Sequence, residues 1–327
     1  MDISVIVVTY NQESSIGRTL DSILAQETDA EFEIIIGDDC STDGTEAVCR
    51  RYAEKYPDKI KYIRRSENLG VTRNYFDCIE RAQGRYLADC AGDDFWIDNS
   101  KLQKQFEILE KRPDVTVVAT RWNIFRANDN SKTPSPEAYP PGEYEGSSLL
   151  VPIITDGAPI HLCTCLYRKK IINDALDTKR EFMIDAAYSC EDQQILLALA
   201  DAGKIVVLPD ITLNYSVGHD SISHRHEFRN RFAYSLKAFR QSLKLQQSFL
   251  DDIDGEKIEK VRKYNEKLTN YLATLMFRSG PEICDEYGKS SWIMTDNIPV
   301  KSKIYKALMA NKNIWKLALS LRNIMPV

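Results

Sequence analysis

The sequence predicts an α/β protein with a mainly parallel central sheet flanked by helices, and three observations carry this prediction. Short β-branched runs alternate with segments of helical hydrophobic spacing through the first 120 residues. The first run, residues 3–9, is continuous rather than alternating, which is typical of a strand buried on both faces. The connections between runs are long enough to hold crossover helices, as parallel strands require.

The individual elements follow in order along the chain. The expected strands are residues 3–9, 34–36, 60–63, 85–90, 115–119, 161–167, 205–208 and 211–217. The expected helices are residues 16–24, 47–53, 75–82, 102–109 and 191–200. Pro57 and Gly84 each follow a helical segment and are common helix stops. Six prolines and glycines cluster within residues 126–146, which predicts a long loop there.

Composition and charge exclude several classes of protein. With 327 residues, 43% of them hydrophobic and 28% charged, the chain is typical of a globular protein. The net charge of -5 gives no support to a nucleic-acid partner. The eight cysteines form no CxxC pair, which argues against zinc-ribbon and redox motifs and favours a reducing compartment. A basic signal-peptide region and an apolar run of roughly 20 residues are both lacking, so we expect a cytoplasmic protein.

Polar and acidic residues follow the first, second and fourth expected strands. These segments are 9–11 (TYN), 37–45 (GDDCSTDGT) and 91–96 (AGDDFW). Because ligands of open α/β sheets bind outside the carboxyl ends of the strands, the three segments predict a binding site at one edge of the sheet. Asp-rich strand exits also occur as turns and helix N-caps, and Asp43 before Gly44 fits that interpretation equally well.

Asp93 and Asp94 are stronger evidence of a metal site than Asp38 and Asp39 are. Two neighbouring carboxylates at a buried strand end repel each other unless a cation or hydrogen-bond donors compensate. A hard divalent ion, held by one or two carboxylates and by ligand phosphates, is the usual solution. The chain has neither GxGxxG after the first strand nor GxxxxGK[ST], which argues against dinucleotide and P-loop sites. A nucleotide site built from carboxylates and a metal remains.

Five segments, in order, resemble the GT-A fold glycosyltransferases, specifically the inverting enzymes of family 2. They are VIVVTYNQESSIGRTLDSILAQ, EIIIGDDCSTDGT, NLGVTRNYFDCIERAQGRYLADCAGDDFW, EDQQILLALA and LNYSVGHDSISH. The resemblance covers residues 1–224 and implies a Rossmann-like sheet, a nucleotide-sugar donor and a role in building a bacterial surface polysaccharide. Residues 225–327 would form a helical C-terminal region.

Residue by residue, the resemblance implies roles at the binding site. The nucleotide would be bound by Thr9, Tyr10, Glu13, Asp38, Asp39, Arg73 and Asp93. Asp93, with Asp94 beside it, would hold Mg²⁺ or Mn²⁺. Asp192 of the Glu191-Asp192 pair would be the catalytic base. Without the resemblance, favourable charge at a helix N-terminus is the better explanation of that pair.

One position departs from the family's pattern. Many family members have an acidic residue where this chain has Ala91, so the full set of metal ligands is not given by the motif. A histidine ligand often comes from later in such domains. His219 and His224 are the two candidates, of which we take His219.

The implied activity is transfer of a hexose from a nucleotide-diphosphate sugar, with uridine the expected base, to an acceptor hydroxyl. A single displacement with inversion needs one carboxylate base and a metal that stabilises the leaving diphosphate. A nucleotidyltransferase is one alternative, although residues 9–17 lack the basic glycine-rich loop that it usually needs. A sugar-nucleotide-binding module without turnover is the other, and Ala91 is its support.

The acceptor, a glycan or a lipid-linked glycan, would be selected by residues 126–146, residues 161–167 and the C-terminal helices. Within 161–167, Cys163 and Cys165 are expected to share one strand face.

The C-terminal segment differs in charge from the rest of the chain. Residues 301–327 carry six Lys or Arg and no Asp or Glu, with apolar residues that include Trp315 at broadly helical spacing. This pattern fits a basic amphipathic helix on the cytoplasmic face of an anionic membrane. It fits equally a helix that docks on the protein with its basic face in water. Residues 225–280 fit a helix pair that forms a homodimer.

Overall fold

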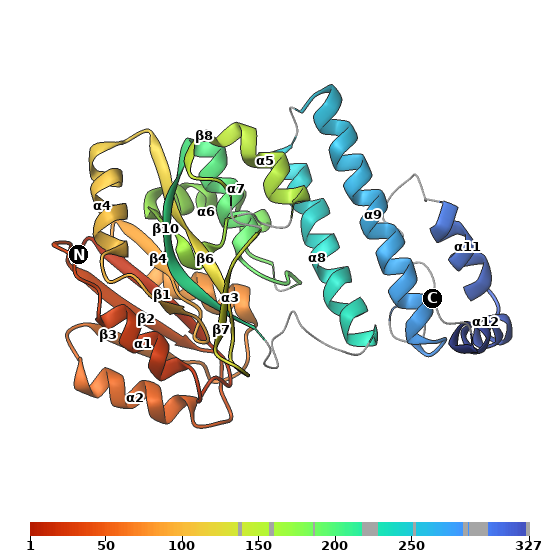
Figure 1. The fold of residues 1–327 in the computed structure, drawn as a ribbon, viewed down its shortest axis with the longest axis horizontal. Helices are drawn as coiled ribbons and strands as arrows, with labels where there is room; N and C mark the ends of the chain where they lie inside the picture. The colour runs from red at the N-terminus through yellow and green to blue at the C-terminus, as the bar shows by residue number, and fades with distance from the viewer. Residues whose placement is uncertain are drawn as a thin grey trace. The chain divides into compact units, whose positions relative to one another are not determined.

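The computed structural model describes residues 1–136, 139–156, 160–185, 187–217, 228–250, 253–283, 287 and 300–324. The chain divides into two compact units. The first consists of Met1–Gly218 and Leu245–Leu250, and the second of His219–Lys244 and Asp251–Val327. Among the described residues, the first unit is a sheet covered by helices and the second is helical (Figure 1).

One mixed sheet forms the centre of the first unit. Its strands are β1 (Ile3–Thr9), β2 (Phe32–Asp38), β3 (Ile60–Arg64), β4 (Tyr86–Asp89), β5 (Phe95–Trp96), β6 (Val115–Arg126), β7 (Ser131–Pro134), β8 (Gly142–Glu145), β9 (Leu166–Arg168) and β10 (Lys204–Val217). Neighbouring strands follow the order β3-β2-β1-β4-β9-β6-β10-β5, with β7 beside β6 and β8 beside β10.

The N-terminal half of the sheet is parallel, as predicted. β1 pairs in parallel with both β2 and β4, and β2 pairs in parallel with β3. Every residue of β2 is buried, as expected for a strand covered on both faces. The register places Thr9 opposite Asp38 at the ends of β1 and β2. Because β2, β1 and β4 are adjacent, the polar segments that follow them, which we call the exits of these strands, meet at one edge of the sheet. This confirms the predicted placement of the three segments.

The other half of the sheet mixes strand directions. β6 and β10 pair in parallel, whereas β9 is antiparallel to both β4 and β6. The short strands β5, β7 and β8 are also antiparallel to their partners. β9 therefore joins the two parallel groups into one sheet.

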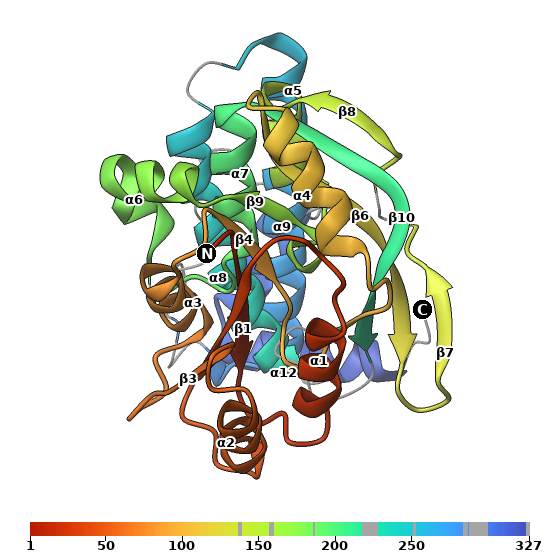
Figure 2. The same ribbon diagram turned by 90° about the vertical axis from the view of Figure 1, so that its left-hand side faces the viewer.

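Helices cover both faces of this sheet (Figure 2). They are α1 (Ile16–Leu24), α2 (Thr45–Lys55), α3 (Val71–Arg81), α4 (Lys101–Lys111), α5 (Gly146–Thr155), α6 (Lys169–Met183) and α7 (Asp192–Ala202). Ile3, Val5 and Val7 of β1 share one hydrophobic core with apolar residues of α1 and α4. Ile6 points to the opposite face, because side chains alternate along a strand, and α3 packs against β1 and β2.

Two segments contain more structure than the sequence predicted. Residues 126–146 are more than a loop, since they include β7 and β8. Both strands are short and polar and β7 ends in proline, so neither has the hydrophobic alternation by which strands are recognised. Helices α5 and α6 were also not expected: α5 contains Pro152, and α6 is kinked at Lys179.

The structure differs from the prediction at three of the expected strands. Residues 161–167 begin with a 3₁₀ helix, η1 (Leu162–Thr164), and only then enter β9. Cys163 and Cys165 therefore do not share a strand face. Residues 205–208 and 211–217 belong to a single strand, β10, whose register shifts between Val207 and Ile211. Such an irregularity interrupts the alternating pattern without ending the strand.

The second unit is built from α8 (Phe228–Phe249), which extends into the first unit's residues, α9 (Gly255–Ser279), α11 (Val300–Met309) and α12 (Lys312–Ile324). Trp315 of α12 is fully buried. Its Nε1 donates a hydrogen bond to the Phe277 carbonyl at 2.8 Å, so α12 docks on α9 through this side chain. No helix in the parts of the chain that the structure describes is long and apolar enough to cross a membrane.

Candidate active site

The chain beyond β4 runs against the end of β1 and brings Asp93 to the edge of the sheet. The Gly92 N–H donates to the Val8 carbonyl at 3.1 Å. A Cβ at Gly92 would lie 2.9 Å from Thr9 Oγ1 and would displace the Gln12 side chain, so glycine favours this close approach. The polar exits of β1 and β4 are thereby held in contact.

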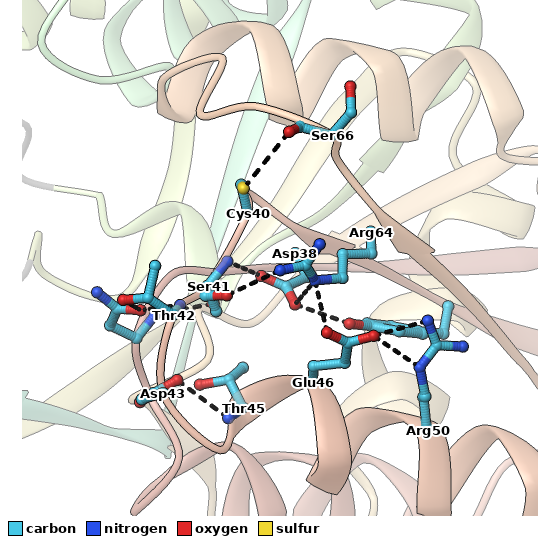
Figure 3. Close-up of polar contacts among 12 residues, drawn as sticks. Asp38, Cys40, Ser41, Thr42, Asp43, Thr45, Glu46, Arg50, Arg64 and Ser66 are labelled. Atoms are coloured by element: carbon cyan, nitrogen blue, oxygen red, sulfur yellow. Dashed lines mark hydrogen bonds and ion pairs between the residues drawn. The ribbon is translucent and has the colours of Figure 1, made fainter.

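The loop after β2 is organised around Asp38 (Figure 3). Asp38 is fully buried, and its Oδ1 accepts from the Ser41 N–H at 2.9 Å while its Oδ2 accepts from the Tyr62 hydroxyl at 2.7 Å. The Arg64 guanidinium lies 4.0 Å from Oδ2 and donates to the Ser41 carbonyl at 3.0 Å. Both carboxylate oxygens are thus engaged within the protein, and Asp38 holds the loop in shape.

Asp39 links the same loop to the start of α3. Its Oδ1 accepts from the Leu69 N–H at 2.7 Å and its Oδ2 accepts from the Gly70 N–H at 2.9 Å. Burial raises the pKa of Asp39 above its ordinary value. Gly70 immediately precedes α3, so this contact fixes where that helix begins. Arg73 is exposed in the first turn of α3.

Tyr10 and Glu13 lie just beyond β1 and differ in their surroundings. Tyr10 is 43% exposed. Glu13 Oε2 accepts from the Gly44 N–H at 3.0 Å, and the Glu13 N–H donates to Asp43 Oδ2 at 3.1 Å. Asp43 Oδ1 also accepts from the Thr45 N–H at 3.0 Å at the start of α2, as a turn residue does. Glu13 and Asp43 therefore join the exits of β1 and β2.

Two residues far apart in the sequence fix the backbone of Asp93 and Asp94. Ser216, near the end of β10, donates through its N–H to Asp94 Oδ1 at 2.9 Å and through its hydroxyl to the Asp93 carbonyl at 2.7 Å. Arg18 of α1 donates to the Asp93 carbonyl at 3.4 Å. The Arg18 guanidinium is itself held over the Phe95 ring, 4.0 Å from its centroid. The partly exposed Asp93 side chain is thus set at the sheet edge by α1 and β10.

Asp94 is only 1% exposed and belongs to a different environment from Asp93. One of its carboxylate oxygens, a ring nitrogen of His161 and Sγ of Cys163 all lie within 4.8 Å of one another. Burial and the charge of Asp93 raise the pKa of Asp94 well above its ordinary value. Burial lowers the pKa of His161 to about 4, so its imidazole is neutral at physiological pH.

The Glu191-Asp192 pair lies at the start of α7. Burial raises the pKa of the partly buried Asp192 to about 6. Burial and the charge of Asp192 raise the pKa of Glu191 well above its ordinary value. The charge of Asp192 also raises the pKa of Asp94, which places these two carboxylates near each other although they are distant in the sequence.

Asp89, the last residue of β4, is a third carboxyl group in this region. It is 4% exposed, and burial raises its pKa to about 7, with the charge of Asp192 adding to the shift. The hydroxyls of Tyr75 and Tyr167 lie close enough to lower that pKa in part. Neither carboxylate oxygen of Asp89 has a hydrogen bond of good geometry with any described residue. Asp89 therefore lies within electrostatic reach of Asp192.

Asp94 interacts electrostatically with both Asp93 and Asp192. Thr9 lies beside Gly92, and Asp38 and Asp39 lie in the adjoining loop after β2. The predicted ligands His219 and His224 lie outside the described residues.

Five residues around the site received no individual role at the site from the sequence: Arg18, Asp89, His161, Cys163 and Ser216. They lie within segments that the sequence singled out, but pairings between distant elements bring them to the site. His161 and Cys163, two positions apart in an apolar segment, offered the one local signal.

The carboxylates at the sheet edge fit a hard divalent cation. Mg²⁺ and Mn²⁺ favour oxygen ligands, and Mg²⁺ is commonly held by one or two carboxylates together with phosphate and water. Asp93 offers a partly exposed carboxylate at the place where a ligand would enter. Burial, and after it the charge of Asp93, raise the pKa of Asp94, and a cation at Asp93 would offset the repulsion between the two neighbouring carboxylates.

Related sequences match about a third of the chain. The uncharacterized protein Rv1520 of Mycobacterium tuberculosis is 44% identical over 114 residues, which are 35% of this chain and 33% of that protein. The putative teichuronic acid biosynthesis glycosyltransferase TuaG of Bacillus subtilis is 41% identical over 110 residues, 34% of this chain and 42% of that protein. The matched stretch thus spans between a third and a half of these relatives.

Solved structures share the fold over nearly the whole chain. Staphylococcus aureus TarS 1-349 in complex with UDP-GlcNAc has a TM-score of 0.57 and 17% identity, covering 95% of this chain and 91% of that one. The mannosyltransferase PcManGT of Pyrobaculum calidifontis, in complex with GDP-Man and Mn²⁺, has a TM-score of 0.54 and 15% identity, covering 97% and 86%. The fold is therefore the α/β GT-A fold.

The family description "Glycosyl transferase family 2" matches residues 4–175, more than half of the chain. That stretch contains the parallel half of the sheet and the carboxylates that follow β2 and β4. The chain belongs to glycosyl transferase family 2.

Proposed function

We propose that the protein is an inverting glycosyltransferase that moves a hexose from a nucleotide-diphosphate sugar to an acceptor hydroxyl. The observation that carries this proposal is the proximity of Asp192, with a pKa raised to about 6, to the Asp93-Asp94 pair at the sheet edge. Family membership over residues 4–175 supports the same reaction class.

The donor would bind across the exits of β1, β2 and β4. Tyr10 exposes an aromatic ring on which a nucleobase can stack, and Asp39 lies in the adjoining loop. The exposed guanidinium of Arg73 suits a bidentate contact with the diphosphate. Asp93, fixed through its backbone by Ser216 and Arg18, would hold a divalent cation, Mg²⁺ or Mn²⁺. When bound, that ion supplies Lewis-acid stabilisation of the charge that gathers on the leaving diphosphate.

Asp192 would act on the acceptor side. A general base must lose its proton near the working pH and must lie within reach of the attacking hydroxyl. Its pKa of about 6 leaves it ionised and ready to accept a proton at neutral pH. The raised pKa values of Glu191 and Asp89 come from the same buried, acidic surroundings. A base on one side and a diphosphate leaving on the other give single displacement with inversion.

The donor class and the acceptor are proposed by analogy with the relatives. A uridine-diphosphate sugar is supported by the TarS complex with UDP-GlcNAc, while the PcManGT complex with GDP-Man keeps guanosine open. A surface polysaccharide, or a lipid-linked precursor of one, is supported by the name of TuaG. We propose residues 1–224 as the catalytic domain and residues 225–327 as a region for acceptor, membrane or homodimer contact.

Replacing the proposed base tests this function. Asp192→Asn is expected to lower transfer by 10²- to 10⁴-fold while nucleotide binding and folding are kept. Asp201→Asn, an exposed acid at the other end of α7, is the matched control and should retain activity. A rate of sugar transfer in Asp192→Asn equal to that of the wild type would contradict the proposal. If the wild-type protein bound nucleotide but transferred sugar to no acceptor, a sugar-nucleotide-binding module without turnover would be favoured instead. Ala91 in the metal motif is the observation that supports this alternative.

A further inference from the structure

Three side chains of metal-ligating types lie beside Asp93, and in the reaction proposed above Asp93 alone is the metal ligand. A carboxylate oxygen of Asp94, a ring nitrogen of His161 and Sγ of Cys163 all lie within 4.8 Å of one another. Asp94 is 1% exposed and Cys163 is 7% exposed, whereas His161 is partly buried, so the group is largely enclosed and reached from solvent at His161. We propose that these three side chains form a second metal site, specific for a soft divalent cation of the Zn²⁺ type and separate from the carboxylate of Asp93.

Asp94 has one oxygen available for this role. Its Oδ1 accepts a hydrogen bond from the Ser216 N–H at 2.9 Å. Its Oδ2 is buried and has no hydrogen bond of good geometry with a described residue, although the Cys163 thiol lies close enough to lower the pKa of Asp94 in part. Buried carboxylate oxygens without a donor are rare because their desolvation is costly. A bound cation would interact with Oδ2, and the hydrogen bond from the Ser216 N–H to Oδ1 would hold the Asp94 carboxylate in orientation.

His161 offers a ring nitrogen whose lone pair is engaged in one long hydrogen bond. Its Nδ1 accepts from the Cys163 N–H at 3.3 Å, which assigns the ring proton to Nε2. Nδ1 can therefore bind a metal by giving up one long hydrogen bond. The rings of Trp122 and Tyr215 lie with their centroids 5.6 and 4.8 Å from that of His161 and restrict its movement.

Cys163 is supported as a thiolate ligand by the backbone. Its Sγ accepts a hydrogen bond from the Ala91 N–H at 3.4 Å. An N–H directed at the sulfur stabilises the negative charge that a metal-bound thiolate carries. Ala91 is also the position at which many family members have an acidic residue. The alanine side chain has no atom that can bind a metal, so Ala91 contributes to the proposed site only through its backbone N–H.

The donor types decide which metal fits. Thiolate, imidazole and carboxylate together suit Zn²⁺, whereas Mg²⁺ and Mn²⁺ favour oxygen ligands alone. In a tetrahedral zinc site the ligand atoms lie about 3.5 Å apart, given bonds of about 2.0–2.3 Å. The widest separation in the group is at most 4.8 Å. No two ligand atoms therefore have to approach each other by more than roughly 1.3 Å, and water would complete the coordination.

Titration with Co²⁺, a spectroscopic substitute for Zn²⁺, tests the proposal on the full chain. Mg²⁺ in excess keeps the oxygen-ligand site at Asp93 occupied. The expected result is one equivalent of Co²⁺ bound with a thiolate-to-metal charge-transfer band, displaced by Zn²⁺. The band is expected to disappear in Cys163→Ser and to persist in Cys165→Ser, whose thiol is equally buried but lies outside the group. His161→Asn should weaken binding by more than the 10- to 100-fold typical of an outer-shell partner.

Two results would overturn the proposal. One is Co²⁺ bound with oxygen and nitrogen ligands only, with a spectrum that Cys163→Ser leaves unchanged. The other is the absence of any Co²⁺ binding in excess Mg²⁺. X-ray absorption of the Zn²⁺-loaded wild-type protein decides the same question without relying on variants, because it counts the sulfur ligands. Neither measurement depends on transfer activity, so failure here leaves the proposed function untouched.

Discussion

Asp192 is a carboxylate whose surroundings matter as much as its position. Burial at the start of α7 raises its pKa to about 6, into the range where a general base works best near neutral pH. Asp93 and Asp94 are neighbours in the chain, yet their environments are opposite. Asp93 is partly exposed at the sheet edge, while Asp94 is buried with His161 and Cys163. Two neighbouring carboxylates of one motif thus differ in their exposure to solvent and in the side chains that surround them.

The pKa of Asp192 predicts a pH profile. Transfer, measured as kcat/KM, should fall about tenfold per pH unit below about pH 6, because the protonated carboxyl cannot accept the proton of the acceptor hydroxyl. Initial rates between pH 4.5 and 8 at saturating divalent metal check this. A rate that stays level from pH 8 down to pH 5 would exclude Asp192 as the base.

At the scale of elements, β4, β9 and α3 meet around the buried carboxyl of Asp89. Tyr75 of α3 and Tyr167 of β9 lie close to it, and their hydroxyls contact each other at 2.5 Å. Burial holds the pKa of Asp89 at about 7 in the folded protein, against 3.8 for the ordinary group. Between these two values the folded state binds the proton and the unfolded state does not, so stability falls as pH rises from about 4 to about 7.

Asp89→Asn is therefore expected to remove that pH dependence. The variant should be more stable than the wild type at pH 8, by up to roughly 4 kcal/mol at about 1.36 kcal/mol per pKa unit, and nearly equal to it at pH 4. Urea unfolding of both proteins at the two pH values measures the difference. A difference that is the same at pH 4 and pH 8 would mean that Asp89 does not carry the proton in the folded state.

The contact between α12 and α9 gives a second prediction at this scale. Trp315 is fully buried and donates to the Phe277 carbonyl, so Trp315→Ala should destabilise the second unit by about 3–5 kcal/mol. Ile314, its neighbour, is 49% exposed, and Ile314→Ala should stay within about 0.5 kcal/mol of the wild type. Calorimetric unfolding distinguishes the two. Equal effects of both substitutions would show that α12 is not docked through Trp315.

The spacing of apolar residues along the chain was sufficient to predict some strands and helices but not others. β1 and α1 could be predicted because their apolar spacing is uninterrupted and their burial follows from it. β7 and β8 could not, because strands of four polar residues are set by pairing with β6 and β10 rather than by their own composition. The family motifs pointed to Asp93 and Asp192. They did not reveal the buried group of Asp94 with Cys163, which exists only because η1 packs beside the end of β4.

At the scale of the whole molecule, charge is divided between the two units. The first contains 24 Lys and Arg against 36 Asp and Glu, and the second contains 19 against 12. In the second unit, Lys303 and Lys306 of α11 are exposed beside Ile304, which is itself 56% exposed. Trp315 is buried and unavailable as an anchor, so contact with an anionic membrane surface would rest on these lysines and on the exposed isoleucine.

This surface predicts lipid-dependent binding. The protein should sediment with vesicles containing phosphatidylserine and not with purely zwitterionic vesicles, and added salt should release it. At about 1 kcal/mol per lysine, Lys303→Ala with Lys306→Ala should weaken binding roughly 30-fold. Lys257→Ala with Lys260→Ala on α9 removes the same charge elsewhere and should change binding little. Equal losses in both double variants would point to net charge rather than to α11.

Nucleotide binding by the wild-type protein and by Asp93→Asn, followed by thermal unfolding, tests the central claim most directly. UDP, GDP, dTDP and ADP are each added with and without Mn²⁺. The account predicts that one diphosphate, at 100 times its Kd, stabilises the wild-type protein by about 2.7 kcal/mol only when Mn²⁺ is present, and that Asp93→Asn loses this effect. Unchanged unfolding with all four diphosphates, in the presence of metal, would contradict a nucleotide-sugar site at the exits of β1, β2 and β4.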